Sequence, residues 1–173
     1  AGRTADALIG SLAHRYMELM AKDGIAHWPA SRLVALTPVM AHWLVSQGLP
    51  VDQAASGAQR VAGMLDTALA SEEGRWVLEK RDKDDVELAI SRADKLLVST
   101  HVVDRTFIED GVRWIIDYNS VQLDPAIVDT DLQAITGNYR EQLARYSLLF
   151  ADDGLPIRQA IYFLSIGRIA ILA

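Results

Sequence analysis

The stretch DRTFIEDGVRWIIDYNS, residues 104–120, predicts a β-hairpin with an acidic residue toward each end. The dipeptide Asp110-Gly111 favours a tight hairpin turn, because both residues tolerate the positive φ angles that such a turn requires. Asp104 lies six residues before this turn and Asp117 six residues after it. We therefore expect the two carboxylates to face each other across neighbouring strands.

Two opposed carboxylates are a costly arrangement in a sheet. Like charges placed directly opposite each other destabilise the strand pair, and one of the two pKa values rises unless a cation lies between them. A hard divalent ion such as Mg²⁺ or Mn²⁺ relieves this repulsion, because it prefers carboxylate, carbonyl and water oxygens. The alternative is a pair of solvated acids near a hairpin, and the spacing alone does not choose between them.

The rest of the chain predicts a mixed α/β fold. Apolar residues recur at helical spacing in the first half, and β-branched residues alternate or cluster in the second. The expected helices are 8–19, 31–46, 52–70, a short capped turn from Ser71, and at most 130–150, divided at Gly137 with Asn138 capping the second part. The expected strands are 86–91, 96–108, 112–118, 157–165 and 168–172. A strand–helix–strand ending implies at least one parallel pairing, so we expect a mixed sheet.

Composition excludes several classes of protein. The 173 residues suit one domain, and the net charge of −6 is not that of a protein that holds DNA by bulk charge. The absence of cysteine excludes disulfides, thiolate zinc sites and iron–sulfur clusters. There is no G-x₄-G-K-[ST] loop, so the chain is not itself an ATPase. There is no leader, and no apolar run approaches the ~20 residues of a membrane span, so we expect a cytoplasmic location without membrane contact. Because the sequence opens at Ala1 without methionine and stops inside an apolar stretch, we also expect a fragment of a longer polypeptide.

Three side chains on the predicted helices are further candidates. His14 projects roughly opposite the apolar stripe of its helix, which makes it either a ligand or an exposed surface histidine. Gln142 and Tyr146 are four residues apart and share a helix face. Gln142 can bond a phosphate, a base or the backbone, whereas Tyr146 also continues an apolar stripe, which favours packing.

Taken together, five short motifs resemble the RecB-type nuclease domain of the PD-(D/E)xK superfamily, found at the C-terminal end of UvrD-like helicase–nucleases such as RecB and AddA. The motifs are Gly10-x₃-His14-x₃-Glu18, Glu87, Val103-Asp104-Arg105, the run from Ile115 to Ser120, and Tyr139-Arg-Glu-Gln142-Leu-x-x-Tyr146. The resemblance spans about residues 8–164. It implies a single nuclease-like domain over residues 1–173, with a restriction-endonuclease-like core, a mixed central sheet flanked by helices, and a helical insert over 20–84.

The resemblance also implies a site and a reaction. The implied metal ligands of Mg²⁺ or Mn²⁺ are His14, Asp104, Asp117 and the backbone carbonyl of Tyr118, with Glu87 as a less direct catalytic group. The implied DNA contacts are Gln142, Tyr146, Arg105 and Arg140. The implied activity is metal-dependent exonuclease or nuclease cleavage of DNA in double-strand-break processing and recombinational repair. The implied substrate is a single-stranded DNA end, fed to the site by the helicase portion of the parent chain, with or without a partner subunit.

One residue departs from the family pattern. The family has lysine where this chain has Asn119, two residues after Asp117 and therefore on the same face of the strand. That lysine orients the attacking water and offsets developing negative charge, and loss of one such group costs ~10²–10³ in rate. Lys95, Arg105 and Arg140 are candidate replacements. The alternative to an active nuclease is therefore an attenuated or inactive nuclease-like domain that binds DNA or supports its helicase.

Overall fold

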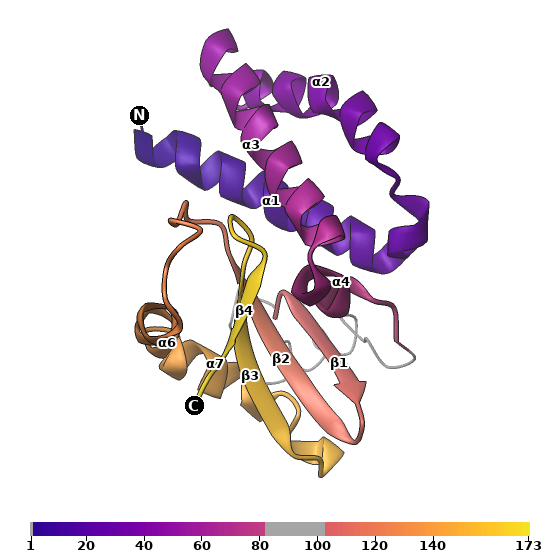
Figure 1. Cartoon of the computed structure of the whole chain (residues 1–173), viewed down its shortest axis with the longest axis vertical. Helices are drawn as coiled ribbons and strands as arrows, with labels where there is room; N and C mark the ends of the chain where they lie inside the picture. The colour runs from indigo at the N-terminus through magenta and orange to yellow at the C-terminus, as the bar shows by residue number, and fades with distance from the viewer. Residues whose placement is uncertain (1, 82–102) are drawn as a thin grey trace. The chain divides into compact units, whose positions relative to one another are not determined.

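The computed structural model describes residues 2–81 and 103–173 and divides into two compact units (Figure 1). The helical unit comprises Ala1–Glu79, Asn119–Leu123 and Phe163–Arg168. The sheet unit comprises Lys80–Tyr118, Asp124–Tyr162 and Ile169–Ala173. The predicted strand at 86–91 and the first part of the one at 96–108 lie outside the described residues.

Helices form the first unit, as their apolar spacing predicts. They are α1 Gly2–Asp23, α2 Ala30–Ser46, α3 Val51–Ala70 and α4 Glu72–Leu78, with a short 3₁₀ turn at Ile25–His27. The third helix, α3, packs against both α1 and α2 (Figure 1). The hydroxyl of Ser71 accepts a hydrogen bond from the backbone N–H of Gly74 at 2.9 Å, so the predicted cap of α4 is confirmed.

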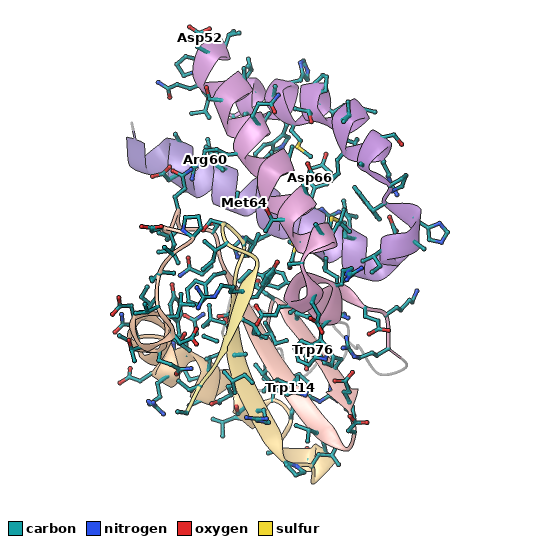
Figure 2. All side chains as sticks on the ribbon, in the orientation of Figure 1. Asp52, Arg60, Met64, Asp66, Trp76 and Trp114 are labelled. Carbon is teal, nitrogen blue, oxygen red and sulfur yellow. The ribbon has the colours of Figure 1, made fainter. Side chains whose placement is uncertain are left out.

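The amphipathic character of α3 explains its place in this unit. Its apolar face, which includes Met64, is buried, whereas Asp52 and Asp66 are exposed (Figure 2). Arg60 reaches across to Asp6 of α1, with 3.0 Å between Nη1 and Oδ1. Because the apolar area removed from water is the main stabilising term in such packing, the buried stripe of α3 provides the core of the unit.

The sheet contains four strands in the order β1-β2-β3-β4. They are β1 Arg105–Glu109, β2 Val112–Asn119, β3 Ile157–Phe163 and β4 Arg168–Ile171. The strands β1 and β2 pair antiparallel through a turn in which both central residues have positive φ, 51° at Asp110 and 75° at Gly111. The hairpin predicted from this dipeptide is therefore confirmed.

The pairing of β2 with β3 is parallel. Two backbone hydrogen bonds establish the direction, from Arg113 N to Pro156 O and from Leu164 N to Asn119 O, each 2.9 Å long. Both partners advance along the sequence together, which only parallel strands allow. The predicted mixed α/β fold is therefore confirmed at this level.

Two helices lie between β2 and β3, namely α6 Asp129–Gly137 and α7 Arg140–Leu148. The division at Gly137 is confirmed, but the prediction that Asn138 caps the second helix is wrong. Asn138 has helical angles and its N–H donates to Ile135 O, so it continues the end of α6. Tyr139 takes the position before α7.

The segment after α7 is tied to β2 by a buried ion pair. Arg113 Nη2 lies 3.0 Å from Asp153 Oδ2, and the Arg113 guanidinium lies 4.6 Å from the ring centre of Phe150. Arg113 and Asp117 are four residues apart on one strand, so their side chains share a sheet face. The pair therefore helps to hold α7 over the face that carries Asp117.

Within residues 2–81 and 103–173, no helix is both long enough and apolar enough to cross a membrane.

Candidate functional site

The site begins with the two acids of the hairpin. The last ladder pair joins Arg105 and Ile116, and continuing this register by one residue sets Asp104 opposite Asp117. Asp104 itself lies just before β1. Its Oδ2 accepts the backbone N–H of Tyr118 at 2.9 Å, which ties it to β2. The prediction that the two carboxyl groups are neighbours is confirmed. The prediction that Asp104 lies within a strand is wrong by one residue, since β1 begins at Arg105.

Asp117 is the buried member of the pair. Its residue is 4 % exposed, and Nε2 of Gln142 on α7 donates to its Oδ2 at 2.5 Å. The pKa of Asp117 is raised to about 7, chiefly by burial and next by the negative charge of Asp104, whereas the hydrogen bond from Gln142 lowers it. The carboxyl of Asp117 is thus costly to ionise while no cation accompanies it.

Tyr146 lies one helical turn after Gln142 and faces the same acids. Its residue is 5 % exposed. Burial raises the pKa of its phenol to about 12, and the charges of Asp117 and Asp104 contribute in the same direction. The sheet unit therefore brings together four residues that the sequence singled out, and Tyr146 combines packing with proximity to the acids.

The raised pKa of Asp117 predicts how stability depends on pH in the metal-free protein. Between the unfolded pKa of 3.8 and the folded pKa of about 7, the folded state binds more protons than the unfolded state, so stability falls as pH rises. From pH 5 to pH 8 we expect the wild type to lose roughly 2–3 kcal/mol relative to Asp117→Asn. Urea unfolding in EDTA measures this difference, and parallel pH profiles for the two proteins would contradict it.

Asn119 is the last residue of β2, and its uncharged side chain stabilises the turn that follows. Its residue is 6 % exposed, and its Oδ1 accepts the backbone N–H of Val121 at 2.9 Å. Such a bond to the residue two positions on is the side-chain turn for which asparagine is well suited. The hydroxyl of Ser165 holds the same turn by donating to Val121 O at 2.8 Å. Position 119 therefore supplies a turn and no cation.

His14 belongs to the helical unit and is half-buried on α1. Its Nδ1 lies 2.7 Å from the carbonyl oxygen of Gly10, one turn earlier. When Nδ1 donates its proton to this carbonyl, the lone pair resides on Nε2, and metal-binding histidines are commonly oriented in this way. Because the two acids belong to the sheet unit, the role of His14 as their fellow ligand stays a prediction.

Packing explains why a glycine, with no side chain, occupies position 10. A Cβ at this position would lie 2.8 Å from the hydroxyl oxygen of Ser120, which follows β2 within the same helical unit. Only glycine permits this approach without displacement. Glu18, the last residue of the N-terminal motif, is exposed and lies 3.4 Å from Arg15.

Tyr118, the expected carbonyl ligand, lies next to Asp117 in β2. Its backbone N–H holds Asp104, as described above. Its ring contacts Tyr162 edge-on, with 6.3 Å between the ring centres, and burial raises the pKa of its phenol. The side chain is therefore part of the core, and only the backbone of Tyr118 is available for the expected role.

Two arginines that were expected to contact DNA have different surroundings. Arg105 is 3 % exposed and lies over the ring of Phe107 at 5.1 Å. Strand alternation places it on the sheet face opposite Asp117. Burial of the guanidinium does not favour a direct contact with DNA, and the expected DNA-binding role of Arg105 stays a prediction. Arg140 is exposed and donates to the carbonyl of Ala173 at 3.1 Å.

Comparisons of the chain with protein-family models, with curated proteins and with solved structures found no match. Function is therefore inferred from the residues of the site. In the described ranges, no group of three or more His, Asp or Glu side chains is arranged to hold a metal ion. Glu87 and Lys95 lie outside these ranges.

Sequence reasoning missed Arg145, which lies beside Tyr146 on α7. Its side chain is exposed, and its positive charge lowers the pKa of the Tyr146 phenol, against the larger effects that raise it. The available signal was its spacing of three residues from Gln142, which places the two side chains on adjoining parts of one helix surface.

Proposed function

We propose that the chain is a metal-dependent phosphodiester hydrolase acting on DNA, a nuclease domain of the RecB-type PD-(D/E)xK class. The observation that carries this proposal is the acid pair of the hairpin, in which Asp117 is buried against Asp104 and tied to Gln142. A strongly perturbed carboxyl with a specific charged neighbour is characteristic of functional sites, because folding alone gains nothing from such repulsion.

The donor set suits a hard divalent cation. Oδ2 of Asp104 accepts the N–H of Tyr118, Oδ2 of Asp117 accepts from Nε2 of Gln142, and the two acids also hydrogen-bond each other. Carboxylate oxygens are the ligands that Mg²⁺ and Mn²⁺ prefer. When bound, the cation would supply charge neutralisation at the pair and Lewis acidity toward a phosphoryl oxygen. We propose His14 and the Tyr118 carbonyl as the remaining protein ligands.

The chain's other residues would act by orientation. Gln142 holds the Asp117 carboxylate through one oxygen, and the ion pair between Arg113 and Asp153 holds the segment after α7 against β2. Such support keeps the acids in the geometry the reaction needs. We propose a DNA strand, delivered as a single-stranded end by a helicase portion of the parent polypeptide, as the substrate. The corresponding cellular setting is double-strand-break processing and recombinational repair.

A second candidate function is a nuclease-like domain that binds DNA or braces its helicase without cutting. The observation that favours it is Asn119, whose carboxamide is committed to the turn with Val121. No positive charge is present at this position of the strand, and the attacking water would lose that support.

The deciding experiment follows degradation of a 5′-labelled single-stranded oligonucleotide by the purified protein with Mn²⁺, with Mg²⁺ and with EDTA. We expect cleavage with either cation and none with EDTA. Isothermal titration with Mn²⁺ tests the ligands independently of turnover. Absence of both cleavage and Mn²⁺ binding would refute the nuclease proposal, whereas binding without cleavage would favour the second candidate.

His14 is tested in the same titration. We expect His14→Ala to weaken Mn²⁺ binding at least about tenfold, because removal of a ligand costs no less than removal of the groups that orient one. His42, an exposed histidine of α2, provides the matched control as His42→Ala. Equal Mn²⁺ affinity in the two variants would remove His14 from the site and leave the acid pair and the Tyr118 carbonyl as the proposed ligands.

A further inference from the structure

A phosphodiester bound at the acid pair would add one negative charge to those of Asp104 and Asp117. Asp104 and Asp117 together exceed what one divalent cation neutralises once the phosphate arrives, and position 119 adds no positive charge. Electrostatic stabilisation of developing charge is usually the largest single contribution to catalysis of this kind. A positively charged side chain near the pair would therefore stabilise the bound phosphodiester.

Arg145 has the position and the exposure for this task. It lies on α7, three residues after Gln142, whose side chain bonds Asp117 directly. Residues three apart on a helix have neighbouring side chains, with Cβ atoms roughly 5–6 Å apart. Gln142 is half-buried over the acid, and Arg145 is exposed, so the guanidinium lies on the solvent side of the contact between α7 and β2.

The charge of Arg145 is also uncommitted within the described part of the chain. Among residues 2–81 and 103–173, no acid lies within ion-pair distance of its guanidinium, including Glu141 one turn earlier on the same helix. The pKa of the Tyr146 phenol responds to Arg145 and to both acids, which is consistent with a short separation between them.

Four other described arginines near the sheet are placed differently. Arg105 is buried on the opposite sheet face, Arg113 pairs with Asp153, and Arg140 bonds the carbonyl of Ala173. Arg158 lies over the ring of Trp114 at 5.1 Å, and strand alternation puts Trp114 on the face away from Asp117.

We propose that Arg145 binds a non-bridging oxygen of the substrate phosphodiester at the acid pair. This inference rests on the proposed nuclease function and deepens it, since it assigns phosphate binding to a side chain that the motifs leave unspecified. Guanidinium suits the task, because its planar array of donors matches two phosphate oxygens at once and it stays charged throughout the working pH range.

The experiment compares Arg145→Gln and Arg145→Lys with Arg158→Gln, the last as a matched loss of one exposed arginine from the same unit. Cleavage of the labelled oligonucleotide in Mn²⁺ gives kcat and KM, and Mn²⁺ titration reports on the acid pair. We expect Arg145→Gln to lower kcat/KM about 10²-fold with unchanged Mn²⁺ affinity. The lysine variant should recover part of the loss, and Arg158→Gln should match the wild type.

A merely structural role is separated by the salt dependence of DNA binding, measured by anisotropy. Loss of one phosphate contact should reduce the slope of log K against log salt by about 0.7 for a single strand, and a packing defect would leave that slope unchanged. If the wild type cuts DNA and Arg145→Gln cuts equally well, the assignment of Arg145 is wrong while the nuclease proposal stands. If the wild type neither cuts nor binds Mn²⁺, both fail together.

Discussion

Replacing Asp117 with asparagine is expected to lower DNA cleavage in Mn²⁺ by at least about 10³-fold, because in the proposed nuclease several kcal/mol of transition-state stabilisation would depend on the cation that Asp117 would help to hold. The substitution keeps the volume of the side chain and an oxygen that can accept from Gln142 Nε2. It removes the negative charge that would attract the proposed metal ion. Cleavage rate and Mn²⁺ affinity, measured on the same preparations, should therefore fall together.

Unfolding does not explain such a loss. The pKa of Asp117 is raised to about 7 by burial and by Asp104, so the neutral amide is expected to make the metal-free protein more stable above pH 7 than the wild type. Asp131→Asn, an exposed acid in the first turn of α6, is the matched control and should leave cleavage unchanged. Wild-type cleavage by Asp117→Asn would mean that the acid pair has no part in the chemistry.

Replacing Asn119 with lysine is expected to increase cleavage about 10²-fold. Residues 117 and 119 share a strand face, so the new ammonium would lie on the side of Asp117 and could orient the attacking water. The gain has a structural cost. Lysine does not accept the N–H of Val121, and loss of that hydrogen bond costs roughly 1 kcal/mol of folding stability. Single-turnover cleavage and urea unfolding measure the two effects separately.

Asn119→Ala distinguishes charge from turn geometry. This variant also loses the bond to Val121 but adds no ammonium. We expect it to match the lysine variant in stability and the wild type, or less, in cleavage. Equal cleavage by the lysine and alanine variants would show that release of the turn, and not the added charge, controls the rate. Activity confined to the lysine variant would identify Asn119 as the residue that silences an otherwise complete site.

Features that depend on local backbone geometry could be predicted from the sequence. Asp110 and Gly111 tolerate positive φ, so the hairpin and its register follow from two residues, and the register in turn makes Asp104 and Asp117 neighbours. Helix periodicity likewise predicted α1, α2 and α3 and the break at Gly137. Asn138 was misplaced because an asparagine at that point can either start a helix or end one, and the choice depends on the hydrogen bonds of the preceding turn.

Contacts between segments that are distant in the sequence could be read only from the packed structure. Gln142 and Asp117 are 25 residues apart in the chain, and nothing in either segment encodes that α7 lies on this face of β2. The burial of Arg105, the ion pair of Arg113 with Asp153, and the contact of Gly10 with Ser120 have the same origin. Local propensity acts through neighbouring dihedral angles, whereas packing and electrostatics act through space. The helices, the hairpin and the opposition of Asp104 to Asp117 follow from local sequence. The burial that raises the pKa of Asp117, and its hydrogen bond with Gln142, follow from packing.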